Sequence, residues 1–191
     1  MNRKTLDSLV SYIGLALSAV LVVAGGLAYW GYSFASSSIQ AQLVEQRITF
    51  PDGDMLPVGG EDGFTDEDAA AIAKYAGQAL TTGDQAKAYA DHYIKVHMNS
   101  MAGGKTYGEV SGEYRAALAA DPTSEETASL GQLRMTLFMG DTLRGLLLNA
   151  YAFGVVGTIA LYASIASFVG AAILLLLAAL GFRHAKAVAN E

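Results

Sequence analysis

The chain has 191 residues, 52% of them hydrophobic, and a mean hydropathy of +0.32, a composition typical of a membrane protein rather than a soluble domain. Its 18 acidic residues outnumber its 12 lysines and arginines, so we expect no nucleic acid partner and no docking on anionic lipid headgroups. It contains no cysteine, which excludes disulfides, thiolate metal sites and thiol nucleophiles.

Two charge-free runs, residues 9–34 and 155–182, predict transmembrane helices. Each exceeds the roughly 20 residues that cross a bilayer core, and lipid offers no partner for backbone polar groups outside a helix. An alternative for the first run is a cleaved secretory signal. Its apolar stretch is, however, about twice as long as the usual core of such a signal.

The basic residues at the outer ends of these runs predict the orientation. Arg3 and Lys186 belong to short basic flanks, which favour the cytoplasm. We therefore expect cytoplasmic segments at 1–8 and 183–191 and an extracytoplasmic domain at 35–154, in a plasma-membrane protein.

The first part of this domain is predicted as helix followed by loop. The helical pattern of the first span continues through residues 36–46 until "ITFP", where Pro51 opposes it. Residues 51–64 carry glycines and acidic residues without an apolar period, which indicates a flexible acidic loop. The loop lacks the spacing of a calcium-binding EF-hand.

Three shorter helices follow in the prediction. Thr65 is a helix-capping residue, and its helix is expected to run to about Leu80. The next helix is expected to open at Asp84 and to close at Gly103-Gly104. Thr106 and Glu109 form a predicted capping box in front of a buried stripe, and no segment alternates as a strand would. The residues of that stripe are Tyr107, Val110, Tyr114 and Leu118.

The last helix is predicted to start at Thr123, capped together with Glu126, and to continue through the second span. Gly131, Gly140 and Gly145 are its candidate bends. The expected fold is therefore an all-α membrane protein. Two transmembrane helices flank an extracytoplasmic segment of about four helices, the last continuous or nearly so with the second span.

An interfacial collar is predicted at residues 143–154, "LRGLLLNAYAFG", just outside the second span. Arg144 is expected to pair with Asp141, three residues earlier. The leucines either pack under the outer helices or offer a docking face to a partner. Within this collar, Leu143, Arg144 and Leu147 are the candidates for an interaction site.

A metal site is a weaker interpretation of the central segment. His92 and His97 are five residues apart, which places them on different sides of a helix, and His97 is expected as a hydrogen-bonded core residue. A soft copper site is conceivable on sequence grounds, but methionines at helical spacing more often fill cores, so we expect no metal and no cofactor. The copper candidates are His97, Met98, Met101, Met135 and Met139.

Small residues at steps of about four in the spans predict close helix packing. These ridges either pack the two spans on each other or face a partner protein. The candidate residues are Gly14, Ser18, Ala163, Ser167 and Gly170.

Several stretches together resemble a family of small, two-pass actinobacterial membrane proteins. They are "RITFP", "YAGQALTTGDQAKAYADHYIKVHM", "GGKTYGEV" and "TLRGLLLNAYAFGVVGTIAL". The resemblance covers nearly the whole chain and implies two spans around an outer helical segment. Some members carry an aromatic ring-opening dioxygenase label, which this sequence does not support because the metal ligands for such chemistry are absent from its pattern.

The sequence shows no phosphate-binding loop, no nucleophile elbow and no charged residue within the spans. We therefore expect a non-enzymatic subunit that assists or assembles a larger plasma-membrane complex. Respiratory assemblies are one host class by analogy. The alternative is an extracytoplasmic sensor or ligand-binding module that acts through a membrane partner. The expected partners are the lipid bilayer and membrane proteins.

Overall fold

The computed structural model describes residues 3–187 and is helical, so the all-α prediction is confirmed. The predicted terminal segments therefore extend beyond the described residues at 1–2 and 188–191. No strand occurs between residues 3 and 187, where the only β feature is an isolated bridge between Thr49 and Ala79. In chain order the elements are α1 (Arg3–Gln46), a 3-10 turn η1 (Gly53–Met55), α2 (Asp66–Ala73), α3 (Gly83–Tyr89), a π-helical turn η2 (Ala90–Ile94), α4 (Lys95–Ala102), α5 (Tyr107–Ala120) and α6 (Glu125–Ala187).

The chain divides into two compact units, which are described separately. The first, called the helical pair, combines the part of α1 up to Ser36 with the part of α6 from Val155. The second, called the central unit, spans Ser37–Gly154.

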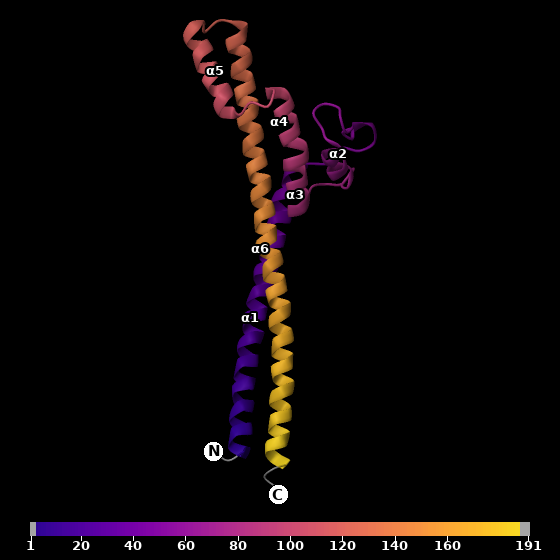
Figure 1. The fold of residues 1–191 in the computed structure, drawn as a ribbon, viewed down its shortest axis with the longest axis vertical. Coiled ribbons are helices and arrows are strands. Elements are labelled where there is room, and N and C mark those ends of the chain that lie inside the picture. Colours follow the sequence, from indigo (N-terminus) through magenta and orange to yellow (C-terminus); the bar gives the residue numbers. More distant parts are fainter. Residues whose placement is uncertain (1–2, 188–191) are drawn as a thin grey trace. The chain divides into compact units, whose positions relative to one another are not determined.

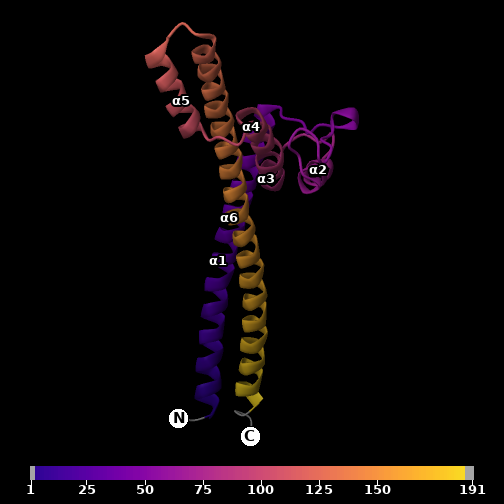
Figure 2. The same ribbon diagram turned by 45° about the horizontal axis from the view of Figure 1, so that its top comes forward.

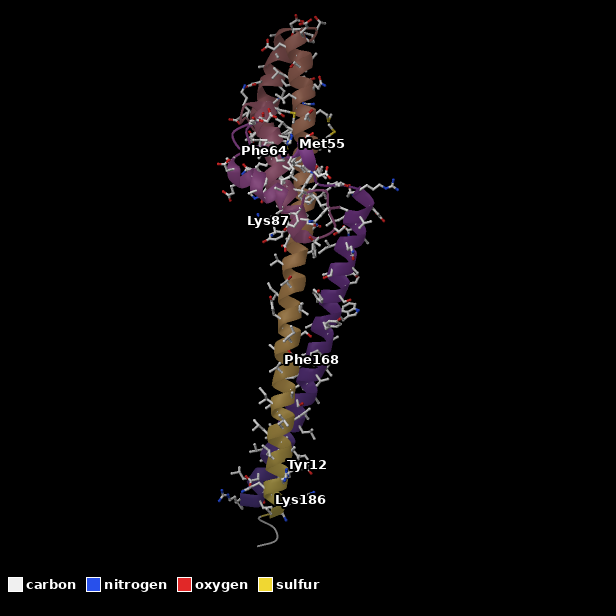
Figure 3. All side chains as sticks on the ribbon, turned by 90° about the vertical axis from the view of Figure 1, so that its right-hand side faces the viewer. Tyr12, Met55, Phe64, Lys87, Phe168 and Lys186 are labelled. Atoms are coloured by element: carbon white, nitrogen blue, oxygen red, sulfur yellow. The ribbon has the colours of Figure 1, made fainter. Side chains whose placement is uncertain are left out.

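The helical pair consists of two antiparallel segments (Figure 1). At the end where α1 begins and α6 ends, the Asp7 carboxylate lies 2.8 Å from His184 Nδ1. Both helices are long and apolar enough to span a membrane. Figure 3 shows mainly carbon on the side chains along this pair, with polar atoms gathered near Lys186. The outward side chains are therefore suited to lipid.

The central unit has a core in which short helices pack against α6. Phe50, Ile72 and Leu80 are almost fully buried in the same cluster as Leu147 of α6. A second cluster joins Val110 of α5 to the α6 leucines and to Met98. The central unit thus forms its core without disulfides, as a cysteine-free chain must.

The predicted helix from Thr65 to Leu80 is too long, because α2 ends at Ala73. Gly77 has a left-handed backbone with φ of 67°, which a continuing helix does not allow. The chain after it runs beside the segment that follows α1. The Phe50 amide donates to the Gln78 carbonyl and the Leu80 amide to the Ile48 carbonyl, each at 2.9 Å.

The short helices begin at capping boxes. Thr65 with Asp68 and Thr106 with Glu109 cap α2 and α5, which confirms both predicted starts. Thr82 with Gln85 caps α3, two residues before the predicted opening at Asp84.

The start of α6 differs from the predicted capping box at Thr123. The Ser124 hydroxyl oxygen accepts from the Thr127 amide at 3.1 Å, so Ser124 is the capping residue. The Thr123 amide instead donates to the Asp121 carboxylate at 2.8 Å. The reason is local competition, because an aspartate two residues earlier satisfies Thr123 first.

The acidic loop forms a folded turn. The Gly60 amide donates to the Phe64 carbonyl at 2.7 Å, and the Phe64 ring is buried. Met55, in contrast, is highly exposed (Figure 3). The predicted flexibility of this loop stays a prediction.

The first part of α6 and α5 lie side by side (Figures 1 and 2). Of the predicted α5 stripe, Val110 is fully buried, whereas Tyr107 and Leu118 are exposed. The stripe prediction is therefore wrong for these two, because α5 buries only a narrow face, around Val110, against α4 and α6.

Helix α6 is one α-helix through all three candidate bends. Two of the glycines make room for neighbouring side chains. A Cβ at Gly131 would touch the Tyr114 ring, and a Cβ at Gly140 would overlap the Met98 thioether. These glycines therefore permit close packing, whereas Gly145 faces open space.

Candidate interaction surfaces

A charged cluster fixes α6 to the π-helical turn in the central unit. The Arg144 guanidinium donates to the Asp91 carboxylate at 2.9 Å, and the Lys87 ammonium donates to the other oxygen of the same carboxylate at 2.5 Å. The prediction that Arg144 pairs with Asp141 is therefore wrong. Arg144 is turned toward the core and reaches a residue 53 positions away in the chain.

The pKa values follow from this geometry. Burial acts to raise the pKa of Asp91, but the hydrogen bonds from Lys87 and Arg144 outweigh it and hold the pKa below its ordinary value. The hydrogen bond to Asp91 raises the pKa of Lys87. The Arg144 Nε is buried without a hydrogen-bond partner. The cluster therefore has a structural role, in which Lys87 and Arg144 both bond to Asp91.

The collar leucines do not all face the same way. Leu147 is buried, and Leu143 and Leu148 pack against the same core cluster. Leu146 is 63% exposed. Internal packing thus accounts for three of the collar leucines, whereas Leu146 is left exposed.

The small residues of the helical pair form its internal seam. The Ser18 hydroxyl donates to the Ala171 carbonyl at 3.1 Å, and the Ser164 hydroxyl donates to the Gly25 carbonyl at 2.8 Å. A Cβ at Gly14 would meet Ala178, and a Cβ at Gly170 would meet Leu21. Ser167 is half-buried and donates to the Ala163 carbonyl at 2.8 Å, whereas Ala163 itself is exposed.

A seven-residue repeat underlies this seam, whereas the predicted spacing was about four residues. Buried small residues every seven positions let two helices approach closely and wind around each other with a left-handed twist. The repeat comprises Ser11, Ser18 and Gly25 on α1, and Gly157, Ser164, Ala171, Ala178 and Ala185 on α6.

The copper candidates do not converge. Met98 is buried beside Gly140, but Met101, Met135 and Met139 are at least half exposed, so the core interpretation is wrong for these three. His97 is exposed and bonded to the Tyr93 carbonyl at 2.9 Å, which corrects its expected core position.

The π-helical turn explains the error at His97. An extra residue in one turn shifts the buried face of the following helix, so that Val96 and Met98 point inward and His97 does not. His92 instead contacts the Asp68 carboxylate at 2.7 Å. Within residues 3–187 no three His, Asp or Glu side chains form a group that could hold a metal ion.

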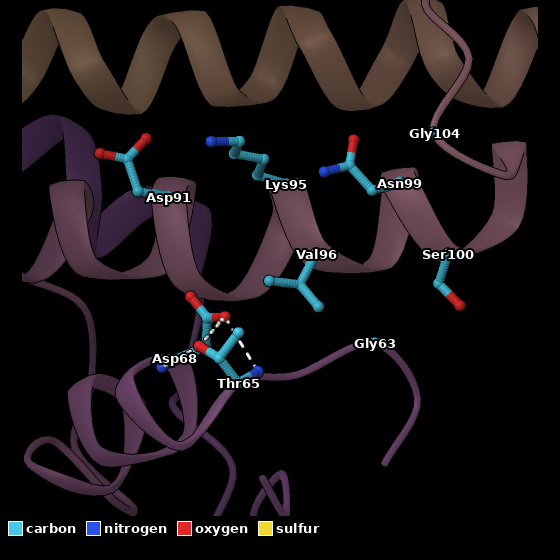
Figure 4. A pocket seen from close by; sticks show the side chains of 9 residues that line it. All are labelled: Gly63, Thr65, Asp68, Asp91, Lys95, Val96, Asn99, Ser100 and Gly104. Atoms are coloured by element: carbon cyan, nitrogen blue, oxygen red, sulfur yellow. Dashed lines mark hydrogen bonds between the residues drawn. The ribbon is translucent and has the colours of Figure 1, made fainter. Parts of the chain in front are cut away.

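A cavity of about 450 Å³, lined by several polar side chains, lies beside the π-helical turn, between α4 and the start of α2 (Figure 4). Asp68 and Asp91 line it, and both already have hydrogen-bond partners. Asp68 bonds to Thr65 and His92, and Asp91 bonds to Lys87 and Arg144. Lys95 and Asn99 add polar groups from α4. The lining of the cavity thus combines carboxylate, ammonium, amide and hydroxyl groups.

An uncovered apolar surface of the central unit lies on α6. Met135, Met139, Leu146 and Phe153 are each at least half exposed. Their spacings of four, seven and seven place them within about 60° of one another on a helix of 3.6 residues per turn. We call this surface the outward face of α6; it is about 27 Å long.

Charge is missing from the outward face. Asp141 and Arg144 are the charged residues between positions 135 and 154, and Arg144 is turned to Asp91. The opposite side of the helix carries the buried Leu137 and Leu147. An apolar stripe of this length on a helix that is already packed on its other side is typical of a protein-binding surface.

Comparison with protein-family models, with curated proteins and with solved structures gives no match. The resemblance to the actinobacterial membrane family therefore stays a prediction.

Proposed function

We propose that the protein is a non-enzymatic membrane protein that acts as an accessory or assembly subunit of a larger plasma-membrane complex. Its two apolar helices would cross the membrane, with both ends in the cytoplasm and the central unit outside. The observation that carries the proposal is the outward face of α6, which is apolar and uncovered over about 27 Å.

The membrane environment makes such a face useful. A helix that leaves the bilayer and continues into water presents its side chains at a fixed height, so a neighbouring membrane protein can meet it without a search in three dimensions. The ion pair between Arg144 and Asp91 holds the other side of α6 against the core. The face is thus preorganised, which lowers the entropic cost of binding.

Purification in mild detergent with mass spectrometry of co-purifying proteins tests the proposal. The expected result is a reproducible partner in near-stoichiometric amount. A lone monomer that carries only lipid would contradict it.

The orientation has its own test, which exploits the absence of native cysteine. Met55→Cys lies on a highly exposed loop of the central unit, and Lys186→Cys lies near the end of α6. A membrane-impermeant maleimide should label the first variant in intact cells and the second only after lysis. The reverse pattern would place the central unit inside.

A ligand-binding or sensor role is the second candidate, favoured by the cavity beside the π-helical turn. Helical turns of this kind often occur at functional sites. A thermal-shift screen of small polar molecules tests it with Asn99→Ala as the control variant. A molecule that stabilises the wild type but not the variant supports the role, and a screen without any stabilising molecule counts against it.

A further inference from the structure

The spacing of the outward face of α6 identifies an occupant. We propose that a second copy of this chain covers the face, so that two α6 helices pack in parallel along Met135–Phe153. The inference rests on the proposed function, because it names the protein that binds at the same face.

The face follows the seven-residue repeat of a coiled coil. Met139, Leu146 and Phe153 recur every seven residues, and Met135 lies four residues before the first of them. Thr142 and Asn149 occupy the alternate seam positions, again seven residues apart from Met135 and from each other. Alternating steps of four and three are the pattern by which two helices interlock side chains along a common seam.

The polar residues of the seam favour an identical partner. The Thr142 hydroxyl has a partner within its own helix, because it donates to the Phe138 carbonyl at 2.7 Å. Asn149 is exposed within an otherwise apolar stripe. In an in-register parallel pair each seam residue faces its own copy, and the Asn149 amide can both donate to and accept from the same amide of that copy, whereas lipid or an apolar partner would leave it unpaired.

Charge leaves the seam as the place where two copies can meet. The chain carries a net charge of −6, so two copies repel each other over most of their surfaces. The seam itself is uncharged, and Asp141 points about 100° away from its neighbour Thr142.

Insertion in one membrane fixes the relative direction of the copies. Two chains with the same orientation can be related only by an axis along the membrane normal, which makes their α6 helices parallel. The parallel geometry in which Asn149 faces its own copy is therefore the geometry that the membrane imposes. The resulting dimer would present two central units to the rest of an assembly.

Disulfide trapping in native membranes tests the register. Thr142→Cys places a thiol on the seam, and Ala152→Cys is the control, since both replaced residues are exposed and small and Ala152 points away from the seam. A disulfide requires Cα atoms about 4.4 to 6.8 Å apart. Mild oxidation should convert most Thr142→Cys into a covalent dimer, with at least tenfold less for Ala152→Cys. Equal yields, or no dimer for either, would overturn the inference.

A benzophenone amino acid at position 142 separates this inference from the proposed function. An adduct of two copies of the 20.0 kDa chain supports both. An adduct with a different protein overturns the second copy as occupant and leaves the proposed function standing. Absence of a protein adduct, with only lipid attached, overturns both.

Discussion

Replacing Arg144 by methionine should destabilise the central unit, because the Asp91 carboxylate loses one of its two cationic donors. Methionine keeps the length and apolar contact of the stem while removing the guanidinium. A hydrogen bond to a charged group contributes about 1.5 to 3 kcal/mol. The side chains of Arg144 and Asp91 are 30% and 20% exposed, so solvent screening reduces the expected loss to about 1 to 2 kcal/mol.

Thermal unfolding in mild detergent, followed by circular dichroism, provides the measurement. A loss of this size should lower the midpoint by about 3 to 6 °C. Asp91→Ala should cost at least as much, since it leaves Arg144 without its acceptor. The double variant should be about 1 kcal/mol more stable than the sum of the two losses predicts. Strict additivity of the two substitutions would refute the anchoring role of the pair.

The pH dependence of the stability tests the same ion pair. The folded-state pKa of Asp91 lies below its ordinary value of 3.8, so its contribution is complete above that value. The contribution is lost as the pH falls through the folded pKa. The stability difference between wild type and Arg144→Met should therefore be constant from pH 7 to about pH 5 and shrink below pH 4. A difference that grows on acidification would contradict this assignment.

Local geometry also predicts the effects of substitutions at Gly145, Gly140, Ser18 and Thr65. Gly145→Ala should stabilise the chain by about 0.5 to 1 kcal/mol in chemical denaturation, because its Cβ meets open space. Gly140→Ala should raise the stability by less than Gly145→Ala, or lower it, because its Cβ overlaps the buried Met98. An equal rise in stability for the two variants would contradict this packing. Ser18→Leu should disrupt the seam of the helical pair and lower the yield of folded protein, whereas the exposed Val20→Leu should not; indistinguishable yields would count against the seam. Thr65→Ala should cost about 1 kcal/mol by removing the cap of α2, and an unchanged midpoint in thermal unfolding would argue against that cap.

Local signals in the sequence were sufficient to predict much of the helical arrangement. The capping boxes at Thr65 and Thr106 specify helix starts through contacts only three residues long, so they are readable without a structure. The same signal at Thr82 was present and was missed. The length of α2 was not readable, because its end depends on pairing between residues near Phe50 and Leu80.

The candidate surfaces were harder to predict because long-range contacts decide them. Arg144 has an acidic residue three positions away, yet it bonds to Asp91, since α3 and the π-helical turn pack on that side of α6. The exposure of His97 depends on the extra residue in the same turn. The seven-residue spacing of Met139, Leu146 and Phe153 was visible in the sequence, but only the structure shows that this side is uncovered.

The central claim, that the outward face of α6 binds protein, is tested most directly by comparing co-purification of the wild type with two glutamate variants. Leu146→Glu places a charge in the middle of the face, and Met55→Glu places one on an equally exposed loop position elsewhere in the central unit. The account predicts that Leu146→Glu loses its co-purifying protein, whether a second copy or another chain, at least tenfold. Met55→Glu should keep it. Full retention of the partner by a folded Leu146→Glu variant would contradict the account.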